Sequence, residues 1–301
     1  MVRDKVNFGI INIDKPTGPT SFSVSNYVRR DLSLKKASHL GTLDPKVTGV
    51  LPITLGRACR LSGFFMNHDK TYIGILHTHK EQNIKDLQKR INKSFLGKIT
   101  QTPPHKSAVK RAPRIREVFQ WELLEVGQHI PNIENELSDI KISSSNISVG
   151  KEFLFVSKVE GGTYIRKLCS DLGEEIGGAH MAELRRTKAG IFDETKMYTL
   201  NEFKEAIEDY KKGKVAKIES MITPADEAIK KVMPTIQIKK DAVKELYKGL
   251  APRKDQFENP KEFEDFPENQ TFAIFSESTF IEIAQKITTE YRIAKPLFVY
   301  N

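Results

Sequence analysis

Residues 39–58 read HLGTLDPKVTGVLPITLGRA, and they form the most informative stretch of this chain. Gly41, Gly49 and Pro52 restrict the stretch to a shaped loop that leads into an apolar strand. Asp44 precedes Pro45, so its backbone is pushed toward an extended conformation that aims its side chain. Taken alone, an Asp-Pro pair is most often a turn. The alternative hypothesis is a rigid loop that presents one carboxylate as a nucleophile or a base.

The segments on either side of this loop predict an α+β fold. An apolar strand over 8–13 ends at a turn over 15–19, and Thr20 or Ser21 can cap a helix that runs through Leu32. Further strands are predicted at 70–77, 115–126 and 152–159, and further helices at 83–95, 164–176 and 200–211. The polar segment over 127–150 is expected to be a long loop or an insertion. Because strands and helices do not alternate strictly, we expect a mixed or antiparallel central sheet with flanking helices.

The length and the C-terminal composition predict two domains. A chain of 301 residues is long enough for one large and one small domain. We place a large domain at 1–233 and a short β-rich domain at 234–301, which contains strand-like runs at 271–275 and 279–284. From residue 255 to residue 282 the sequence has eight acids and one base, so the small domain is acidic.

The overall charge and the cysteine count narrow the class of protein. Lys and Arg number 48 against 39 Asp and Glu, a net charge of +9 that favours a polyanionic partner. Two cysteines exclude a disulfide framework and a four-cysteine zinc site. The sequence shows no secretory signal and no apolar run near 18 residues, so we expect a cytoplasmic protein with no membrane association.

Two glycine-led motifs follow in the second half of the chain. GGTYIRKL (161–168) offers either a core aromatic with a solvated arginine, or a stacking surface with a guanidinium that pairs with a carboxylate. GGAHMAELRRTKAG (177–190) offers either a basic surface strand or phosphate contacts that flank an apolar wall. The side chains concerned are Tyr164, Arg166, Leu184, Arg185 and Arg186.

A run of bases at 106–116, KSAVKRAPRIR, contains no acid. Charge runs are usually solvated faces, but an acid-free run in a chain with many acids suits a nucleic-acid phosphate backbone. The sequence therefore predicts a contact with a nucleic-acid backbone that uses Lys106, Lys110, Arg111, Arg114 and Arg116.

The signals for metals and cofactors are weak. His77 and His79 lie on one face of a predicted strand, but no third ligand follows at a recognisable spacing, so no metal site is predicted. The sequence also contains no phosphate-binding loop with a Lys-Ser/Thr ending and no dinucleotide fingerprint. We therefore expect no cofactor.

Taken together, the motifs resemble the TruB-type pseudouridine synthases. The matching stretches, in order, are GIINIDKPTGPTS (9–21), HLGTLDPKVTGVLP (39–52), KTY (70–72), GGTYIRKL (161–168) and GAHMAELRR (178–186). PPHKSAVKRAPRIR (103–116) is similar to the dyskerin-like branch, the catalytic subunit of box H/ACA ribonucleoproteins. The resemblance implies the pseudouridine synthase fold, and IQIKKDAVKELYKGLAP (236–252) is similar to the opening of a PUA domain, an RNA-binding β-barrel.

The resemblance also implies roles for single residues. Asp44 matches the catalytic aspartate, Arg166 the arginine that pairs with it, and Tyr72 the tyrosine that stacks on the target base. His39 matches a histidine that fills the space left by the flipped nucleotide. Tyr164 and Leu184 match the wall around the flipped nucleotide. Lys15 and Pro16 belong to the motif that supports the active-site loop, and Lys15 is also expected at the substrate. The two arginines expected at the RNA backbone are Arg185 and Arg186.

The function implied by the resemblance is the isomerisation of specific uridines in RNA. The leading hypothesis is a guide-directed enzyme, acting on ribosomal RNA and possibly transfer RNA with an H/ACA guide RNA and small partner proteins. The alternative is a stand-alone enzyme for the T-loop uridine of transfer RNA. A non-catalytic RNA-binding protein of the same descent is a third reading. The acidic C-terminal segment argues against tight anchoring of a guide RNA, because carboxylates repel phosphates.

Overall fold

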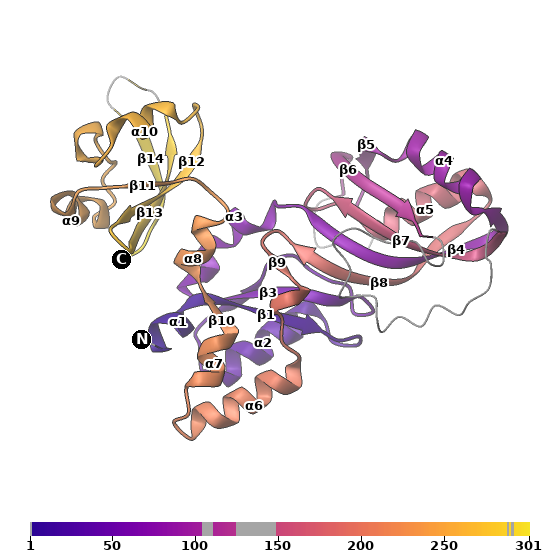
Figure 1. Ribbon diagram of the computed structural model, residues 1–301, viewed down its shortest axis with the longest axis horizontal. Helices are drawn as coiled ribbons and strands as arrows, with labels where there is room; N and C mark the ends of the chain where they lie inside the picture. Colours follow the sequence, from indigo (N-terminus) through magenta and orange to yellow (C-terminus); the bar gives the residue numbers. More distant parts are fainter. Residues whose placement is uncertain (1, 104–110, 125–148, 288, 290–291) are drawn as a thin grey trace.

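The computed structural model describes residues 2–103, 111–124, 149–287, 289 and 292–301 (Figure 1). The predicted loop over 127–150 and two of the predicted RNA contacts, Lys106 and Lys110, lie wholly or mostly outside this range. Within it, no helix is both long enough and apolar enough to span a membrane.

A large sheet of ten strands forms the body of the protein (Figure 1). Its order is β10-β1-β3-β8-β4-β7-β6-β5, with β2 paired to β3 and β9 paired to β8. The strands are β1 (Phe8–Lys15), β2 (Ala37–His39), β3 (Thr48–Gly56), β4 (Lys70–Asn83), β5 (Gly97–Gln101), β6 (Arg114–Leu123), β7 (Val149–Val159), β8 (Ala179–Ala189), β9 (Phe192–Asp193) and β10 (Ile222–Pro224). The prediction of an α+β fold with a mixed sheet is confirmed.

One short parallel pairing joins the two halves of this sheet. All other pairings in it are antiparallel, but β3 runs parallel to β8 and meets it only at Thr48–Arg185 and Gly49–Arg186. A Cβ on Gly49 would lie 2.2 Å from the carbonyl oxygen of Arg186, so only glycine permits the two backbones to approach this closely. The loop that carries Asp44 enters the sheet at this seam.

Helices cover the sheet and start where capping residues predict. The Thr20 side chain accepts from the Ser23 amide at the start of α2, and Thr199 forms a capping box with Glu202 at the start of α6. In Figure 1, α4 and α5 lie at the end of the sheet remote from the C-terminus, and α6 and α7 project below it. The helices are α1 (Val2–Asn7), α2 (Ser21–Asp31), α3 (Ser62–Met66), α4 (Ile84–Ser94), α5 (Ile165–Ile176), α6 (Leu200–Lys211), α7 (Ala216–Met221) and α8 (Ala225–Lys230).

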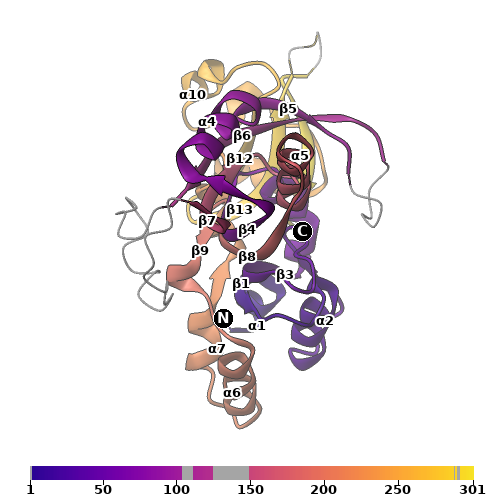
Figure 2. The same ribbon diagram turned by 90° about the vertical axis from the view of Figure 1, so that its right-hand side faces the viewer.

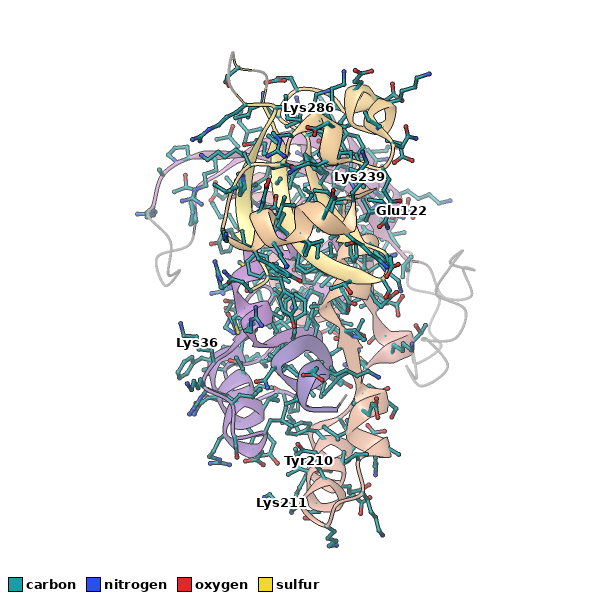
Figure 3. All side chains as sticks on the ribbon, turned by 90° about the vertical axis from the view of Figure 1, so that its left-hand side faces the viewer. Lys36, Glu122, Tyr210, Lys211, Lys239 and Lys286 are labelled. Atoms are coloured by element: carbon teal, nitrogen blue, oxygen red, sulfur yellow. The ribbon has the colours of Figure 1, made fainter. Side chains whose placement is uncertain are left out.

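A second sheet of four strands follows along the chain. Its order is β11-β12-β13-β14, with β11 parallel to β12 and the other pairs antiparallel. The bounds of its elements are β11 (Thr235–Gln237), α9 (Val243–Tyr247), α10 (Pro260–Asp265), β12 (Thr271–Ser276), β13 (Thr279–Lys286) and β14 (Ala294–Val299). Lys286, at the top of Figure 3, fixes the end of α10 to β13 by donating to the carbonyls of Phe263, Glu264 and Phe266.

The two sheets share a hydrophobic cluster. Phe8 of β1 stacks on Phe280 of β13 with 5.8 Å between ring centroids, and Tyr300 lies 4.2 Å from Phe8. The Arg57 guanidinium lies 4.0 Å from the centroid of the Tyr300 ring, a cation–π contact across the same junction. In Figure 2, the second sheet lies behind the large sheet. The two sheets are therefore packed against each other through buried aromatic side chains, and their hydrophobic cores are continuous there.

Candidate active site

The Asp44 loop, residues 40–47, connects β2 to β3 and is fixed from beneath by Lys15. Lys15 is fully buried, and its Nζ donates to the carbonyl oxygens of Pro16 at 2.9 Å, Pro45 at 3.1 Å and Val47 at 2.8 Å. Burial lowers the pKa of Lys15, and the charge of Asp44 opposes that shift. These three hydrogen bonds agree with the expectation that Lys15 belongs to the motif that supports the loop, and they direct its protons at backbone carbonyls instead of at a substrate.

A second clamp comes from the start of α2. The Ser21 hydroxyl accepts from the Leu43 amide at 2.8 Å and donates to the Leu43 carbonyl at 3.0 Å. The Gly18 amide donates to the Pro45 carbonyl at 2.9 Å, and Gly18 has a φ of +107° that favours glycine. The motif at 9–21 therefore fixes the loop on both sides of Asp44.

Asp44 pairs with Arg166, as the sequence predicts. Arg166 lies in the first turn of α5, and its Nη2 donates to Oδ2 of Asp44. Both side chains are about half exposed, at 45% for Asp44 and 47% for Arg166, so the pair lies at an accessible surface. The pair brings together residues 122 positions apart in the sequence.

Tyr72 and Leu184 belong to the same hydrophobic cluster as residues of the Asp44 loop. Both are 8% exposed, and the cluster also contains Leu43 and Val47 from the two sides of Asp44. A Cβ on Gly74 would lie 2.9 Å from a methyl of Leu184, so glycine allows Leu184 to lie across β4.

Tyr164 is held through its backbone at the start of α5. Its amide donates to Gln101 Oε1 at 3.0 Å, and its carbonyl accepts from Gln101 Nε2 at 3.2 Å. Gln101 is buried at the end of β5, and no sequence pattern indicated this clamp. Tyr164 itself is half-buried.

His39 lies at the end of β2, between α2 and the catalytic loop. Its Nε2 is 3.1 Å from the Thr42 hydroxyl and its Nδ1 is 3.5 Å from the Ser25 hydroxyl. Burial, together with the positive charge of Arg186, lowers the pKa of His39. A neutral imidazole is therefore favoured beside the loop at neutral pH.

Arg186 does not contact an RNA backbone. Only 1% of this residue is exposed, and its Nε and Nη2 donate inward to the carbonyls of Val50 at 2.8 Å and Gly41 at 3.0 Å. The prediction is wrong because the side chain turns into the β3–β8 seam, which a sequence pattern does not reveal. A buried guanidinium cannot reach a phosphate in solvent.

Arg185 is also directed elsewhere. Its Nη1 and Nη2 donate to the two carboxylate oxygens of Asp14 at 3.0 and 3.2 Å, and its Nε donates to Glu194. These two carboxylates neutralise its charge, so the expected phosphate contact is not supported.

The described part of the basic run is unevenly exposed. Arg111 is exposed and Arg114 is half-buried. Arg116 has a side chain 22% exposed and lies 3.7 Å from Glu160. An RNA contact here remains a prediction for these three residues.

His77 and His79 gain a third imidazole from β8. The register of β4 with β8 places His180 opposite His77, with ring centroids 4.9 Å apart, and His79 Nε2 lies 3.3 Å from His180 Nδ1. Sequence spacing missed His180, because it is 103 and 101 positions from the other two. Across the described ranges, no group of three or more His, Cys, Asp or Glu side chains is arranged to hold a metal ion.

Comparisons with known proteins agree with this geometry. Residues 29–165 match the family described as TruB family pseudouridylate synthase (N terminal domain), and residues 166–230 match the tRNA pseudouridylate synthase B C-terminal domain. A probable tRNA pseudouridine synthase B of Archaeoglobus fulgidus is 39% identical over 250 residues, which cover 82% of this chain and 70% of the relative. One of Korarchaeum cryptofilum is 41% identical over 249 residues, covering 82% and 69%.

Two solved structures resemble the whole chain. The crystal structure of a Cbf5-Nop10-Gar1 complex matches with a TM-score of 0.80 at 30% identity, covering 100% of this chain and 86% of that one. An H/ACA RNP bound to a substrate RNA containing 2′-deoxyuridine matches with a TM-score of 0.80 at 27% identity, covering 100% and 87%.

Fold, site and comparisons together define an RNA pseudouridine synthase, an enzyme that isomerises uridine within RNA. The chain belongs to the TruB family. The family resemblance and the enzyme class expected from the motifs are thereby confirmed.

Proposed function

We propose that Asp44 is the catalytic carboxylate of this synthase, with Arg166 as its charge partner. The Asp44–Arg166 pair on a doubly clamped loop is the observation that carries the proposal. The reaction breaks the N1–C1′ bond of uridine and forms a C5–C1′ bond. The carboxylate can attack C1′, add to C6 or remove a proton, and each of these roles requires it to be ionised. The adjacent guanidinium of Arg166 donates to that carboxylate.

The remaining side chains suit a nucleotide that has left its stack. Extruding a nucleotide costs a few kcal/mol, and stacking on an aromatic ring returns about 1–3 kcal/mol. We assign that stack to Tyr72, and the apolar wall to Leu184 and Tyr164. His39 takes the place of the extruded base in the RNA.

We propose further that the chain acts within a guide-directed ribonucleoprotein. The support is its likeness over its whole length to Cbf5, which is found in complexes named with Nop10, Gar1 and H/ACA RNA. In this proposal the chain belongs to the dyskerin-like branch, binds a guide RNA and small partner proteins, and isomerises uridines in ribosomal RNA and some in transfer RNA.

The second candidate function is stand-alone action on the T-loop uridine of transfer RNA. The names of the archaeal relatives, probable tRNA pseudouridine synthase B, favour it. The deciding experiment compares tritium release from C5-labelled transfer RNA by the purified chain alone with release after addition of a native RNA and protein fraction. Full turnover by the chain alone supports the stand-alone enzyme. Turnover only with the added fraction, abolished by nuclease treatment of that fraction, supports guidance.

We propose a domain boundary near residue 234 and a PUA-like role in RNA binding for 234–301. The four-stranded sheet begins at Thr235 and packs its helices on the face away from the shared cluster. Because this domain is acidic and carboxylates repel phosphates, we expect its RNA contact to involve few phosphates. We expect the main salt-dependent contact at Arg111, Arg114 and Arg116 instead. Neutralising Arg111 and Arg114 together with Lys110 should flatten the salt dependence of RNA affinity, and an unchanged slope would place the RNA elsewhere.

A further inference from the structure

Arg186 connects three parts of the site that are distant in the sequence. Its Nη2 donates to the carbonyl of Gly41 on one side of the Asp44 loop, and its Nε donates to the carbonyl of Val50 on the other side. Its backbone pairs with Gly49 in the β3–β8 seam and with Tyr72 in the β4–β8 pairing. One side chain therefore spans both ends of the catalytic loop.

Tyr72 lies next to this guanidinium. Tyr72 and Arg186 are opposite each other in the β4–β8 pairing, so their side chains leave the sheet on the same face. The Tyr72 phenol interacts electrostatically with the guanidinium, which opposes the lowering of the pKa of Arg186 by burial. Because both side chains are buried, this contact restricts the tilt of the Tyr72 ring.

The glycines of the loop are adapted to this arrangement. A Cβ on Gly41 would lie 3.3 Å from Nη1 of Arg186, and one on Gly49 would lie 2.2 Å from its carbonyl oxygen. Both glycines also have a positive φ, +102° and +99°, which other residues rarely adopt. The loop is thus fitted around Arg186 on both sides of Asp44.

The charge of Arg186 has no acidic partner in the described part of the chain. No carboxylate there lies within 4.0 Å of it, whereas the neighbouring Arg185 binds two. A second buried cation, Lys70, lies nearby, and its pKa is lowered to about 8 by burial and by the charge of Arg186. Burying unpaired charge is costly, so this arrangement is not explained by stability alone.

We propose that Arg186 is a positioning residue for the isomerisation. It fixes the Tyr72 ring relative to the Asp44 loop, so that both are in place when the N1–C1′ bond of the uridine breaks. In that step the bonding pair leaves with N1 of the uracil and C1′ becomes electron-deficient. The base then rotates and C5 donates a pair to C1′. The C5 proton is released to water and N1 takes up a proton from water, which restores the neutral ring. The proposal rests on the roles given above to Asp44 and Tyr72.

The test uses five variants of the full chain in single-turnover assays with a saturating amount of C5-tritiated RNA. They are Arg186→Met, Arg186→Lys, Tyr72→Phe, the double variant Arg186→Met/Tyr72→Phe, and the control Lys188→Met. Lys188 is an exposed cation two positions further along β8, so its variant matches the charge lost without touching the seam. Asp44→Asn is the inactive reference.

We expect Arg186→Met to slow product formation by about 100-fold or more while changing RNA affinity by less than about threefold. Lys188→Met should react within about twofold of the unmodified chain. Arg186→Lys keeps the charge but not the planar fork, so it should fall between the two. Because Arg186 acts through the Tyr72 phenol, the double variant should lose less than the product of the two single losses.

Three outcomes would overturn the proposal: an unchanged rate in Arg186→Met, losses that multiply in the double variant, or an affinity loss that accounts for the rate. If Arg186→Met does not fold, Arg186→Lys tests the proposal in its place. An unchanged rate with lysine would show that the planar guanidinium is not needed. An active Asp44→Asn would instead refute the proposed catalytic carboxylate, which keeps the two failures distinct.

Discussion

Glu282, in β13, is fully buried, and neither of its carboxyl oxygens has a hydrogen-bond partner in the described structure. Burial raises its pKa from 4.5 to about 8, because the charged form would be desolvated. Between these two values the folded chain holds a proton that the unfolded chain has released. The free energy of unfolding therefore falls as pH rises, by about 1.4 kcal/mol per pH unit.

Replacing Glu282 by Gln removes this proton exchange. From pH 5 to pH 7.5 the contribution of Glu282 declines by about 3 kcal/mol, so Glu282→Gln should gain about that much relative to the unmodified chain over the same interval. The measurement is urea unfolding followed by far-UV circular dichroism at several pH values.

The control is Glu258→Gln, an exposed carboxyl in the same part of the chain. Its difference from the unmodified chain should stay constant with pH. A constant difference for Glu282→Gln as well would show that Glu282 is not held protonated, and the reasoning from burial would fail.

Three further predictions concern the catalytic loop and its neighbours. Asp44→Asn should abolish tritium release while changing the free energy of unfolding by less than about 1 kcal/mol, since the ion pair is half exposed; near-normal turnover would refute its role. Tyr72→Phe should slow the reaction and keep RNA affinity, whereas Tyr72→Ala should also weaken binding by about 1–3 kcal/mol; identical behaviour of the two would exclude stacking. Lys15→Met should remove a donor from the carbonyls of Pro16, Pro45 and Val47, of which Pro45 keeps the Gly18 amide, and cost about 2 kcal/mol, seen as a melting temperature lower by about 4–8 °C; Lys46→Met, exposed in the same loop, should melt normally.

Local features of the chain were predictable from sequence. The helix cap at Thr20 and the helices at 164–176 and 200–211 depend on neighbouring residues, and the structure places them within a residue of the prediction. The Asp44–Arg166 contact was predictable only through the family resemblance, because no local pattern joins two residues so far apart.

Features that depend on cross-strand register were not predictable. Arg185 and Arg186 look alike in sequence, yet alternation along β8 turns one toward Asp14 and the other into the seam. Similarly, the resemblance assigned Lys15 to the motif that supports the active-site loop, but the three backbone carbonyls that accept its protons were not predictable from the sequence. His180 joins His77 only because β4 and β8 pair in one particular register.

The aromatic cluster shared by the two sheets bears on which uridine of a long RNA reaches the active site. Stacked rings at Phe8, Phe280 and Phe298 hold the large sheet and the C-terminal sheet at a fixed distance and orientation. An RNA that touched both sheets would therefore be bound at two sites that lie a fixed distance apart. The number of nucleotides between the two binding sites would then determine which uridine is modified. Lengthening that spacer by one nucleotide should shift the modified position or abolish the modification.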